Sequence, residues 1–131
     1  MENKTRVSFY ALIQNKEGKY LFIKRSENDS WPGVWEIPGG KPEDDEDISD
    51  TLIRETWEEV GLKIEPLSPF HVIHNASPDK KMERLIFRAI LMEDDKVKLS
   101  KEHSAYKWSD FSDPEILESS FLQKVKESLF S

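Results

Sequence analysis

The chain has 131 residues, enough to bury a hydrophobic core, and we expect residues 1–131 to form one domain. It contains no cysteine, which excludes disulfides, thiolate metal sites and cysteine nucleophiles. Its net charge of −7 argues against binding to nucleic-acid polymers, although a metal ion or an arginine can reverse the sign locally for a small phosphorylated ligand.

The start of the chain, MENKTRVSFY, lacks the apolar stretch of a secretory leader. No apolar run approaches the ~20 residues that a membrane-spanning helix needs. We therefore expect a cytoplasmic protein, a monomer or a homodimer, that binds a small molecule and contacts neither a membrane nor a nucleic-acid polymer.

The amino-terminal third is predicted to form a β-hairpin. Residues 6–13 alternate in polarity as a strand does, and residues 20–25 return after a turn. A short apolar piece at residues 34–38 precedes residues 39–48, GGKPEDDEDI, whose glycines and acidic residues predict a loop. The first strand is expected to place four residues on one face: Val7, Phe9, Ala11 and Ile13.

A helix is predicted from about Asp47 to Val60. Asp47 or Ser49 can cap its start, and Gly61 suits its end. Helical spacing predicts this buried stripe: Ile48, Leu52, Ile53, Thr56 and Val60.

The rest of the chain is predicted to hold further strands and a second helix. The expected strands are residues 62–67, 70–76, 83–92, 96–100 and 105–108. An amphipathic helix follows Asp113-Pro114. The pattern indicates a mixed α/β domain.

Three glutamates share one face of the first predicted helix. Glu55, Glu58 and Glu59 stand i, i+3 and i+4 apart, where like charges cost roughly 0.2–0.5 kcal/mol per pair. Either water or a bound cation must offset that repulsion. The segment IPGGK brings backbone close to the helix start, and carboxylate and carbonyl oxygens together are the ligands of Mg²⁺ or Mn²⁺. Because Mg²⁺ often bridges carboxylates to substrate phosphates, this chemistry suggests a metal-dependent enzyme that acts on phosphate or diphosphate groups.

Residues 40–62, GKPEDDEDISDTLIRETWEEVGL, resemble the Nudix box. Seven fixed residues coincide by chance with a probability on the order of 10⁻⁸ per starting position. Two positions depart from the pattern: Thr56 fills an aliphatic slot, and Asp45 replaces a glycine often seen before the first glutamate. The preceding segment, WEIPGGKPE, is similar to MutT-like members of the family. The matching residues are Gly40, Glu46, Arg54, Glu55, Glu58, Glu59 and Gly61, with Leu62 as the closing aliphatic.

The resemblance implies the Nudix α/β/α sandwich, in which a mixed β-sheet lies between the box helix and a C-terminal helix. It implies hydrolysis of a nucleoside diphosphate linked to another group, in which water attacks phosphorus with the help of one to three Mg²⁺ ions, or of Mn²⁺ as a substitute.

The resemblance also assigns roles to single residues. Glu46 and Arg54 match a structural pair that orients carboxylates, and Arg25 matches a phosphate contact. Glu102 matches an acidic residue of the loop before the last strand, as a further ligand or as the base. The metal ligands implied are Glu55, Glu58, Glu59 and the Gly39 carbonyl. The general base stays open among Glu55, Glu59 and Glu102.

The substrate is the least determined part of the prediction. The resemblance places Ser8, Tyr10 and Ile37 on the cleft, a set that suits a purine nucleotide. Oxidised dGTP, other (d)NTPs, ADP-ribose and dinucleoside polyphosphates all stay open. Two rival classes are an isomerase of prenyl diphosphates, which would need a cysteine, and a catalytically silent nucleotide sensor, which would usually have lost box glutamates.

Other residues with reactive or stacking side chains receive simpler interpretations. The three histidines, His71, His74 and His103, show no ligand spacing and are expected to be structural or on the surface. Trp35 is expected in the core, and Trp31 either in a structural position or as a lid that stacks on a base.

Overall fold

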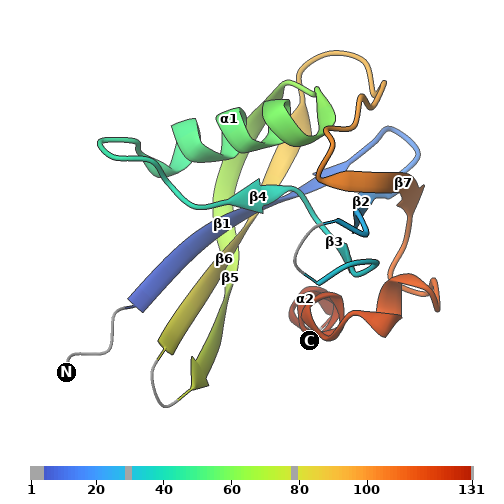
Figure 1. Ribbon diagram of the computed structural model, residues 1–131. Helices are drawn as coiled ribbons and strands as arrows, with labels where there is room; N and C mark the ends of the chain where they lie inside the picture. The colour runs from blue at the N-terminus through green and yellow to red at the C-terminus, as the bar shows by residue number, and fades with distance from the viewer. Residues whose placement is uncertain (1–4, 29–30, 78–79, 131) are drawn as a thin grey trace.

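The computed structural model describes residues 5–28, 31–77 and 80–130 (Figure 1). Over these residues the chain forms one seven-stranded sheet and two α-helices, with a 3₁₀ helix before the second. The elements are β1 (Thr5–Gln14), β2 (Tyr20–Arg25), β3 (Trp35–Glu36), β4 (Gly39–Gly40), α1 (Ile48–Val60), β5 (Ile64–Ser77), β6 (Lys80–Leu91), β7 (His103–Ser109), η1 (Ile116–Glu118) and α2 (Ser120–Phe130).

The sheet is mixed, as expected. Its strand order is β3-β2-β1-β6-β5, with β4 paired to β1 and β7 paired to β2. β1 and β6 run parallel from Thr5 beside Lys81 to Gln14 beside Ile90, and the other pairings are antiparallel. The pairing of Phe9 with Gly40 and of Tyr10 with Gly39 brings the diglycine onto the central strand.

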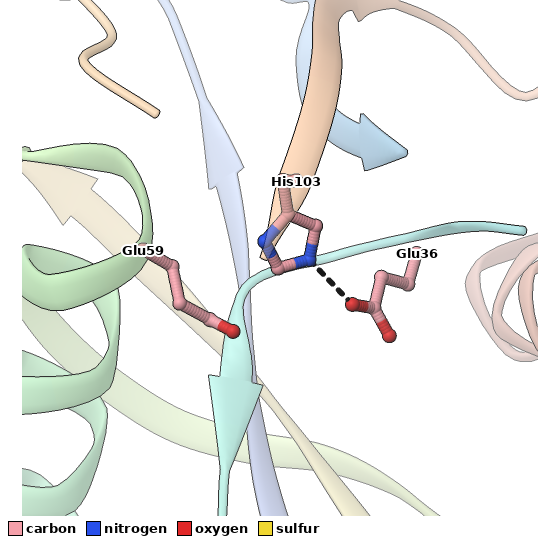
Figure 2. Close-up of side chains that lie close together, drawn as sticks. All are labelled: Glu36, Glu59 and His103. Carbon is pink, nitrogen blue, oxygen red and sulfur yellow. Dashed lines mark hydrogen bonds and ion pairs between the residues drawn. The ribbon is translucent and has the colours of Figure 1, made fainter. Parts of the chain in front are cut away.

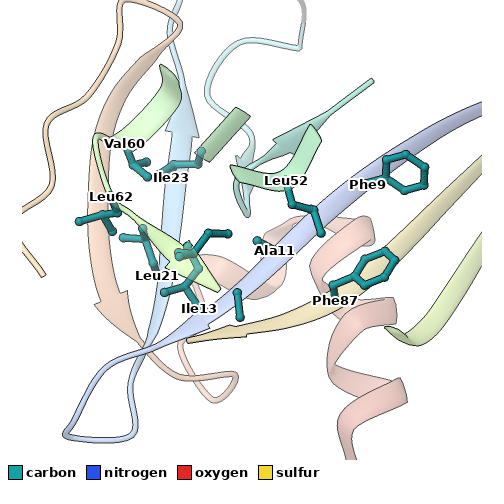
Figure 3. Packing of buried hydrophobic residues seen from close by; sticks show 11 residues of the cluster. Phe9, Ala11, Ile13, Leu21, Ile23, Leu52, Val60, Leu62 and Phe87 are labelled. Carbon is teal, nitrogen blue, oxygen red and sulfur yellow. The ribbon is translucent and has the colours of Figure 1, made fainter. Parts of the chain in front are cut away.

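Alternation along the central strands gives the sheet two apolar faces. Phe9, Ala11 and Ile13 belong to the cluster that contains Leu52 and Val60 of α1, and Figure 3 shows these side chains together. The intervening Leu12 belongs to a second cluster with α2. α1 and α2 therefore cover opposite faces (Figure 1), which confirms the predicted α/β/α sandwich.

The first helix has the ends that its sequence predicts. Asp47 is the N-cap, and its side chain accepts a hydrogen bond from the Asp50 amide at 2.8 Å. Gly61 ends the helix with φ of 68°, a left-handed conformation that glycine adopts without strain.

The buried stripe of α1 is narrower than predicted. Leu52, Thr56 and Val60 are fully buried, but Ile48 and Ile53 are each 41% exposed. The helix packs along its i, i+4, i+8 row, so Ile48 in the first turn and Ile53 beside the row remain partly in water.

Three strand predictions are wrong in detail. Residues 62 and 63 precede β5, whereas residues 64–67 and 70–76 belong to this one strand, whose register shifts around Pro66 and Pro69 because proline has no N–H to donate. Residues 96–100 form no strand. Instead the Lys98 amide donates to the Val60 carbonyl at 2.8 Å and the Ser100 amide to the Glu59 carbonyl at 3.0 Å, so this segment pairs with the end of α1.

Two other boundaries also differ. Gly39 and Gly40, predicted in a loop, form β4. The last helix starts at Ser120 and not directly after Pro114, because Ser119 is extended, with ψ of 121°. The Ser119 hydroxyl accepts a hydrogen bond from the Leu122 amide at 3.3 Å and so caps α2.

Candidate active site

A cleft of about 720 Å³ lies at the edge of the sandwich, bounded by α1, β4 and the loop before β7. Two arginines, Arg25 and Arg84, line the same cleft. Its acidic residues come from β3, α1 and the loop before β7: Glu36, Glu55, Glu58, Glu59 and Glu102. The cleft thus holds both the oxygens that bind a hard cation and the guanidinium groups that bind phosphate.

Glu59 is the most buried of these carboxylates, with 7% of the residue exposed. Its Oε1 accepts a hydrogen bond from the Gly39 amide at 2.8 Å. Burial, together with the nearby charges of Glu36, Glu55 and Glu102, raises the pKa of Glu59 to about 9, and the Gly39 hydrogen bond opposes that rise.

Glu55 lies directly against the diglycine. A Cβ placed on Gly40 would come within 2.5 Å of its Cδ and 2.7 Å of both carboxylate oxygens. Only glycine leaves room for the carboxylate at this position. Burial raises the pKa of Glu55, and the hydrogen bond from Arg54 opposes that rise.

Arg54 connects the box glutamates. It holds Glu46 through two hydrogen bonds, Nε to Oε2 at 2.7 Å and Nη2 to Oε1 at 2.9 Å. Its Nη1 donates to Glu55 at 2.9 Å and to Glu58 at 3.2 Å. The Arg54 hydrogen bonds lower the pKa of Glu46 to about 2, so Glu46 is an ionised anchor for the guanidinium that orients the other two carboxylates.

The wall of the cleft that faces α1 contains Glu36 and His103, two residues whose role the sequence did not indicate. His103 Nε2 lies 2.7 Å from Glu36 Oε2, and ligand atoms of Glu36, Glu59 and His103 all lie within 4.8 Å of one another. Figure 2 shows the three side chains converging from β3, α1 and β7. Glu36 and His103 are 67 positions apart, so their contact leaves no spacing signal in the sequence. The alternation of Trp35, which is buried, with Glu36 is the one local hint.

A second cavity of about 530 Å³ continues from the first. Arg84 lies in the wall of both, with its guanidinium carbon 5.0 Å from the centre of the Phe121 ring. Among the described residues its buried Nε has no hydrogen-bond partner. Trp31 also lines both cavities and is 77% exposed. Trp35 is in the core, as predicted. Six residues are shared by the two cavities: Tyr10, Arg25, Trp31, Glu36, Met82 and Arg84.

The structure brings most of the predicted site residues onto the first cavity. Those that line it are Ser8, Tyr10, Arg25, Gly39, Gly40, Glu55, Glu58, Glu59 and Glu102. Ile37 does not: it has no exposed surface and packs in the core cluster on the α2 side, because strand alternation turns Glu36 to the cleft and Ile37 inward.

These residues fit a divalent cation. Carboxylate oxygens are the donors that Mg²⁺ and Mn²⁺ prefer. The mutual repulsion among Glu36, Glu55 and Glu102 around the buried Glu59 is the electrostatic condition that a bound cation relieves.

The sandwich and its cleft place the chain in the class of α/β domains with a carboxylate site suited to a hard cation. The family model for the NUDIX domain matches residues 4–128, and the chain is a MutT-like member of the Nudix family. The crystal structure of the MutT protein from Methanosarcina mazei Go1 is 35% identical, has a TM-score of 0.74, and covers 86% of this chain and 81% of that one.

Two characterised relatives match parts of the chain. The 8-oxo-dGTP diphosphatase of Proteus vulgaris is 29% identical over 88 residues, which is 66% of this chain and 79% of that protein. The CTP pyrophosphohydrolase of Escherichia coli K12 is 37% identical over 57 residues, which is 44% of this chain. The match spans 42% of the length of the Escherichia coli protein. Within the part of the chain that the structure describes, neither helix has the length and apolar character to cross a bilayer.

Proposed function

We propose that this chain hydrolyses a nucleoside diphosphate linked to a second group, with Mg²⁺, or Mn²⁺ in its place, in the carboxylate site. The observation that supports it best is the convergence of glutamates from α1 with Glu102 on a cleft that also holds Arg25 and Arg84. The two characterised relatives are named for activity on nucleotides.

Four carboxylates and one carbonyl would hold the ion: Glu55, Glu58, Glu59, Glu102 and the backbone oxygen of Gly39. When bound, the ion supplies positive charge that offsets the diphosphate. Arg54 keeps Glu55 and Glu58 oriented through its two Nη1 hydrogen bonds. Arg25 lies where it can contact a phosphate oxygen.

In the reaction, water forms a bond to one phosphorus while the bridging phosphorus–oxygen bond breaks. The products are two phosphorylated fragments, and the water proton passes to a carboxylate. Glu55, Glu59 and Glu102 are the candidates for that base, since all three line the cleft.

For the substrate we propose a (d)NTP or an oxidised nucleotide. The second cavity has aromatic residues, Tyr10 and Trp31, which suit the π-face of a base. It also has the Nε of Arg84, which has no hydrogen-bond partner among the described residues and suits the acceptor atoms of a base. ADP-ribose and dinucleoside polyphosphates are the second candidate class, because the two cavities are continuous and both are open.

The test is a panel of diphosphates, including 8-oxo-dGTP, dGTP, CTP, ADP-ribose and a diadenosine polyphosphate, each incubated with Mg²⁺ or Mn²⁺. The products are separated and quantified by chromatography, because hydrolysis of ADP-ribose or of a diadenosine polyphosphate releases neither free phosphate nor pyrophosphate. We expect turnover that depends on the ion and prefers nucleoside triphosphates. Tight nucleotide binding without turnover would instead show a sensor, and turnover that survives complete ion removal would contradict the metal site.

Glu102→Gln tests whether Glu102, in the loop before β7, is an ion ligand or the base. We expect kcat to fall at least 10-fold and the Mg²⁺ concentration for half-maximal rate to rise. Glu17→Gln, in the exposed hairpin turn, makes the same charge change away from the cleft and is the matched control. If Glu102→Gln matches wild type in kcat and ion requirement, Glu102 is neither ligand nor base.

A further inference from the structure

The cluster of Glu36, Glu59 and His103 has the dimensions of a cation site, but its hydrogen bonds give it a different role. Arg25 Nη1 lies 3.3 Å from both oxygens of Glu36, so this carboxylate already has a cationic partner. A carboxylate only accepts hydrogen bonds, so His103 Nε2 carries the proton toward Glu36 and cannot at the same time bind a metal, while the buried Nδ1 has no hydrogen-bond partner among the described residues.

We propose that Glu36 is a positioning residue. Its two carboxylate oxygens hold the Arg25 guanidinium, and its hydrogen bond with His103 holds the loop that carries Glu102. This proposal rests on the proposed function. Glu36 itself is the end of β3, where it pairs with Ile23 of β2, so the carboxylate projects from the sheet and not from a loop.

The second half of the linkage runs along the chain from His103 to Glu102. His103 is 4% exposed, and its amide donates to the Ser100 carbonyl at 3.3 Å, which closes the turn that displays Glu102. The β2–β7 register shifts at this point, since Lys24 pairs with Ala105 but Arg25 pairs with His103. Such bulges commonly redirect a side chain beside an active site.

The turn is also fixed from its other side. The Ser26 amide donates to the Glu102 carbonyl at 2.8 Å, and the Ser26 hydroxyl donates to the Lys101 carbonyl at 2.7 Å. Ser26 holds the backbone of the turn and Glu36 holds the imidazole, so the backbone from which the Glu102 side chain enters the cleft is fixed in position. Glu36 therefore sets the positions of a phosphate-contacting group and of an ion ligand.

The experiment compares two substitutions of one residue. The amide nitrogen of His103→Gln reaches about as far as the imidazole Nε2 and can still donate to Glu36, whereas the shorter side chain of His103→Asn cannot. We expect His103→Asn to raise the Mg²⁺ concentration for half-maximal rate by ~10–100-fold, and His103→Gln to restore most of the loss.

Glu36→Gln is the second arm. It keeps the side-chain shape but loses the charge and one acceptor, so we expect a rise in KM through Arg25 and also a rise in the Mg²⁺ concentration for half-maximal rate. The double variant with His103→Asn should be less than additive in the ion requirement, because both changes break one linkage.

A buried histidine also contributes to stability, so the fold needs its own control. Ile116→Val removes a methylene from the core on the α2 side and lowers Tm without touching the cleft. A merely structural role for His103 would give His103→Asn the behaviour of Ile116→Val: a lower Tm with unchanged KM and ion requirement. That result would overturn the proposal.

Direct Mn²⁺ binding without substrate, followed by electron paramagnetic resonance, separates this proposal from the proposed function. If wild type hydrolyses no diphosphate but His103→Asn still weakens Mn²⁺ binding and His103→Gln does not, the positioning role stands and the proposed function fails. Loss of one whole Mn²⁺ equivalent in both variants would show that His103 is a ligand and would overturn the proposal. A wild type that binds no Mn²⁺ would overturn both.

Discussion

Gly40 and Glu55 show how closely single residues are fitted at this site. The Glu55 carboxylate lies only 2.5 to 2.7 Å from the position that a Cβ on residue 40 would occupy. Separations of this kind are far inside van der Waals contact, so the glycine is required by its neighbour and not by a turn. Its replacement should act on the ion site first.

We expect Gly40→Ala to push the Glu55 carboxylate away and weaken Mn²⁺ binding at least 10-fold, with a loss of about 1–3 kcal/mol in stability from overpacking. Mn²⁺ titration and denaturant unfolding measure the two effects. Gly18→Ala adds the same methyl in the hairpin turn, where φ is 79°, and should lower stability while Mn²⁺ affinity stays at the wild-type value. Wild-type Mn²⁺ affinity in Gly40→Ala would refute the prediction.

Thr56 is the box position where an aliphatic residue was expected. It is fully buried, and within the described part of the chain its hydroxyl has no hydrogen-bond partner. Thr56→Val keeps the shape and removes the unsatisfied group, so we expect a gain of about 1 kcal/mol in unfolding free energy. Thermal and denaturant unfolding measure it. An equal or lower stability would mean that the hydroxyl is satisfied in solution.

Asp45 is the other departure from the box, and its backbone conformation explains it. Its φ is 64°, in the left-handed region that glycine adopts freely and aspartate tolerates better than most residues. A glycine at this position would adopt the same backbone conformation without strain.

At the scale of elements, the sequence predicted those helices and strands whose formation depends on residues close together in the chain. α1 has caps, an apolar row and a C-terminal glycine within one segment, and β1 and β2 have alternation joined by a short turn, so each is readable from neighbouring residues. β4 has two residues and no periodicity, and only its pairing with β1 makes it a strand. Residues 96–100 look like a strand because Val97 and Leu99 pack on the core, but their backbone bonds go to α1.

The candidate site divides in the same way. The three clustered glutamates on α1 follow from helical spacing and the box, whereas the contact between Glu36 and His103 depends on how β3 and β7 each pair with β2. Ile37 was expected on the cleft from the resemblance, but it is buried in the same core cluster as Trp35, and Glu36 between them faces the cleft.

α1 also supports a prediction about the repulsion among its glutamates. Glu58 has 55% of its side chain exposed and accepts from Arg54 at 3.2 Å, so part of the repulsion is already compensated. Glu58→Gln removes both a like-charge neighbour and an exposed ion pair, each worth a few tenths of a kcal/mol, and the metal-free Tm should stay within a degree or two of wild type.

With Mg²⁺ and substrate, wild type should gain stability by mass action and Glu58→Gln much less, with turnover lower by several orders of magnitude. Thermal melts in EDTA and in Mg²⁺, together with initial rates, measure this. Unfolding of the metal-free variant would show that Glu58 holds structure through Arg54, and unaltered hydrolysis would show a solvated face without a ligand.

At the scale of the whole molecule, the fold gathers several carboxylates in one cleft, around the buried Glu59. The chain has a net charge of −7, and the cleft gathers Glu59 with three other carboxylates that raise its pKa. Glu55 and Glu59 come from α1, Glu36 from β3 and Glu102 from the loop before β7, so the stability of the whole fold is coupled to whatever neutralises these carboxylates.

That coupling predicts a pH dependence with a definite sign. Without added metal, the folded chain holds a proton on Glu59 up to about pH 9, while the unfolded chain releases it near the ordinary value of 4.5. Between those values the folded state binds more protons, so stability is greatest at the acidic end and falls as pH rises, by at most ~1.4 kcal/mol per unit for one proton.

The comparison that isolates this effect is wild type against Glu59→Gln, which keeps the oxygen that accepts from the Gly39 amide but cannot titrate. In EDTA, from pH 5 to pH 8.5, wild type should lose Tm more steeply than the variant. Mg²⁺ should flatten the wild-type curve, because the ion replaces the proton as the partner of the carboxylate, and it should leave the curve of the variant nearly unchanged. The stabilisation by Mg²⁺ should therefore be larger at pH 8.5 than at pH 6. Equal slopes for the two proteins in EDTA would mean that Glu59 ionises in the folded state at its ordinary pKa, and the prediction would be wrong.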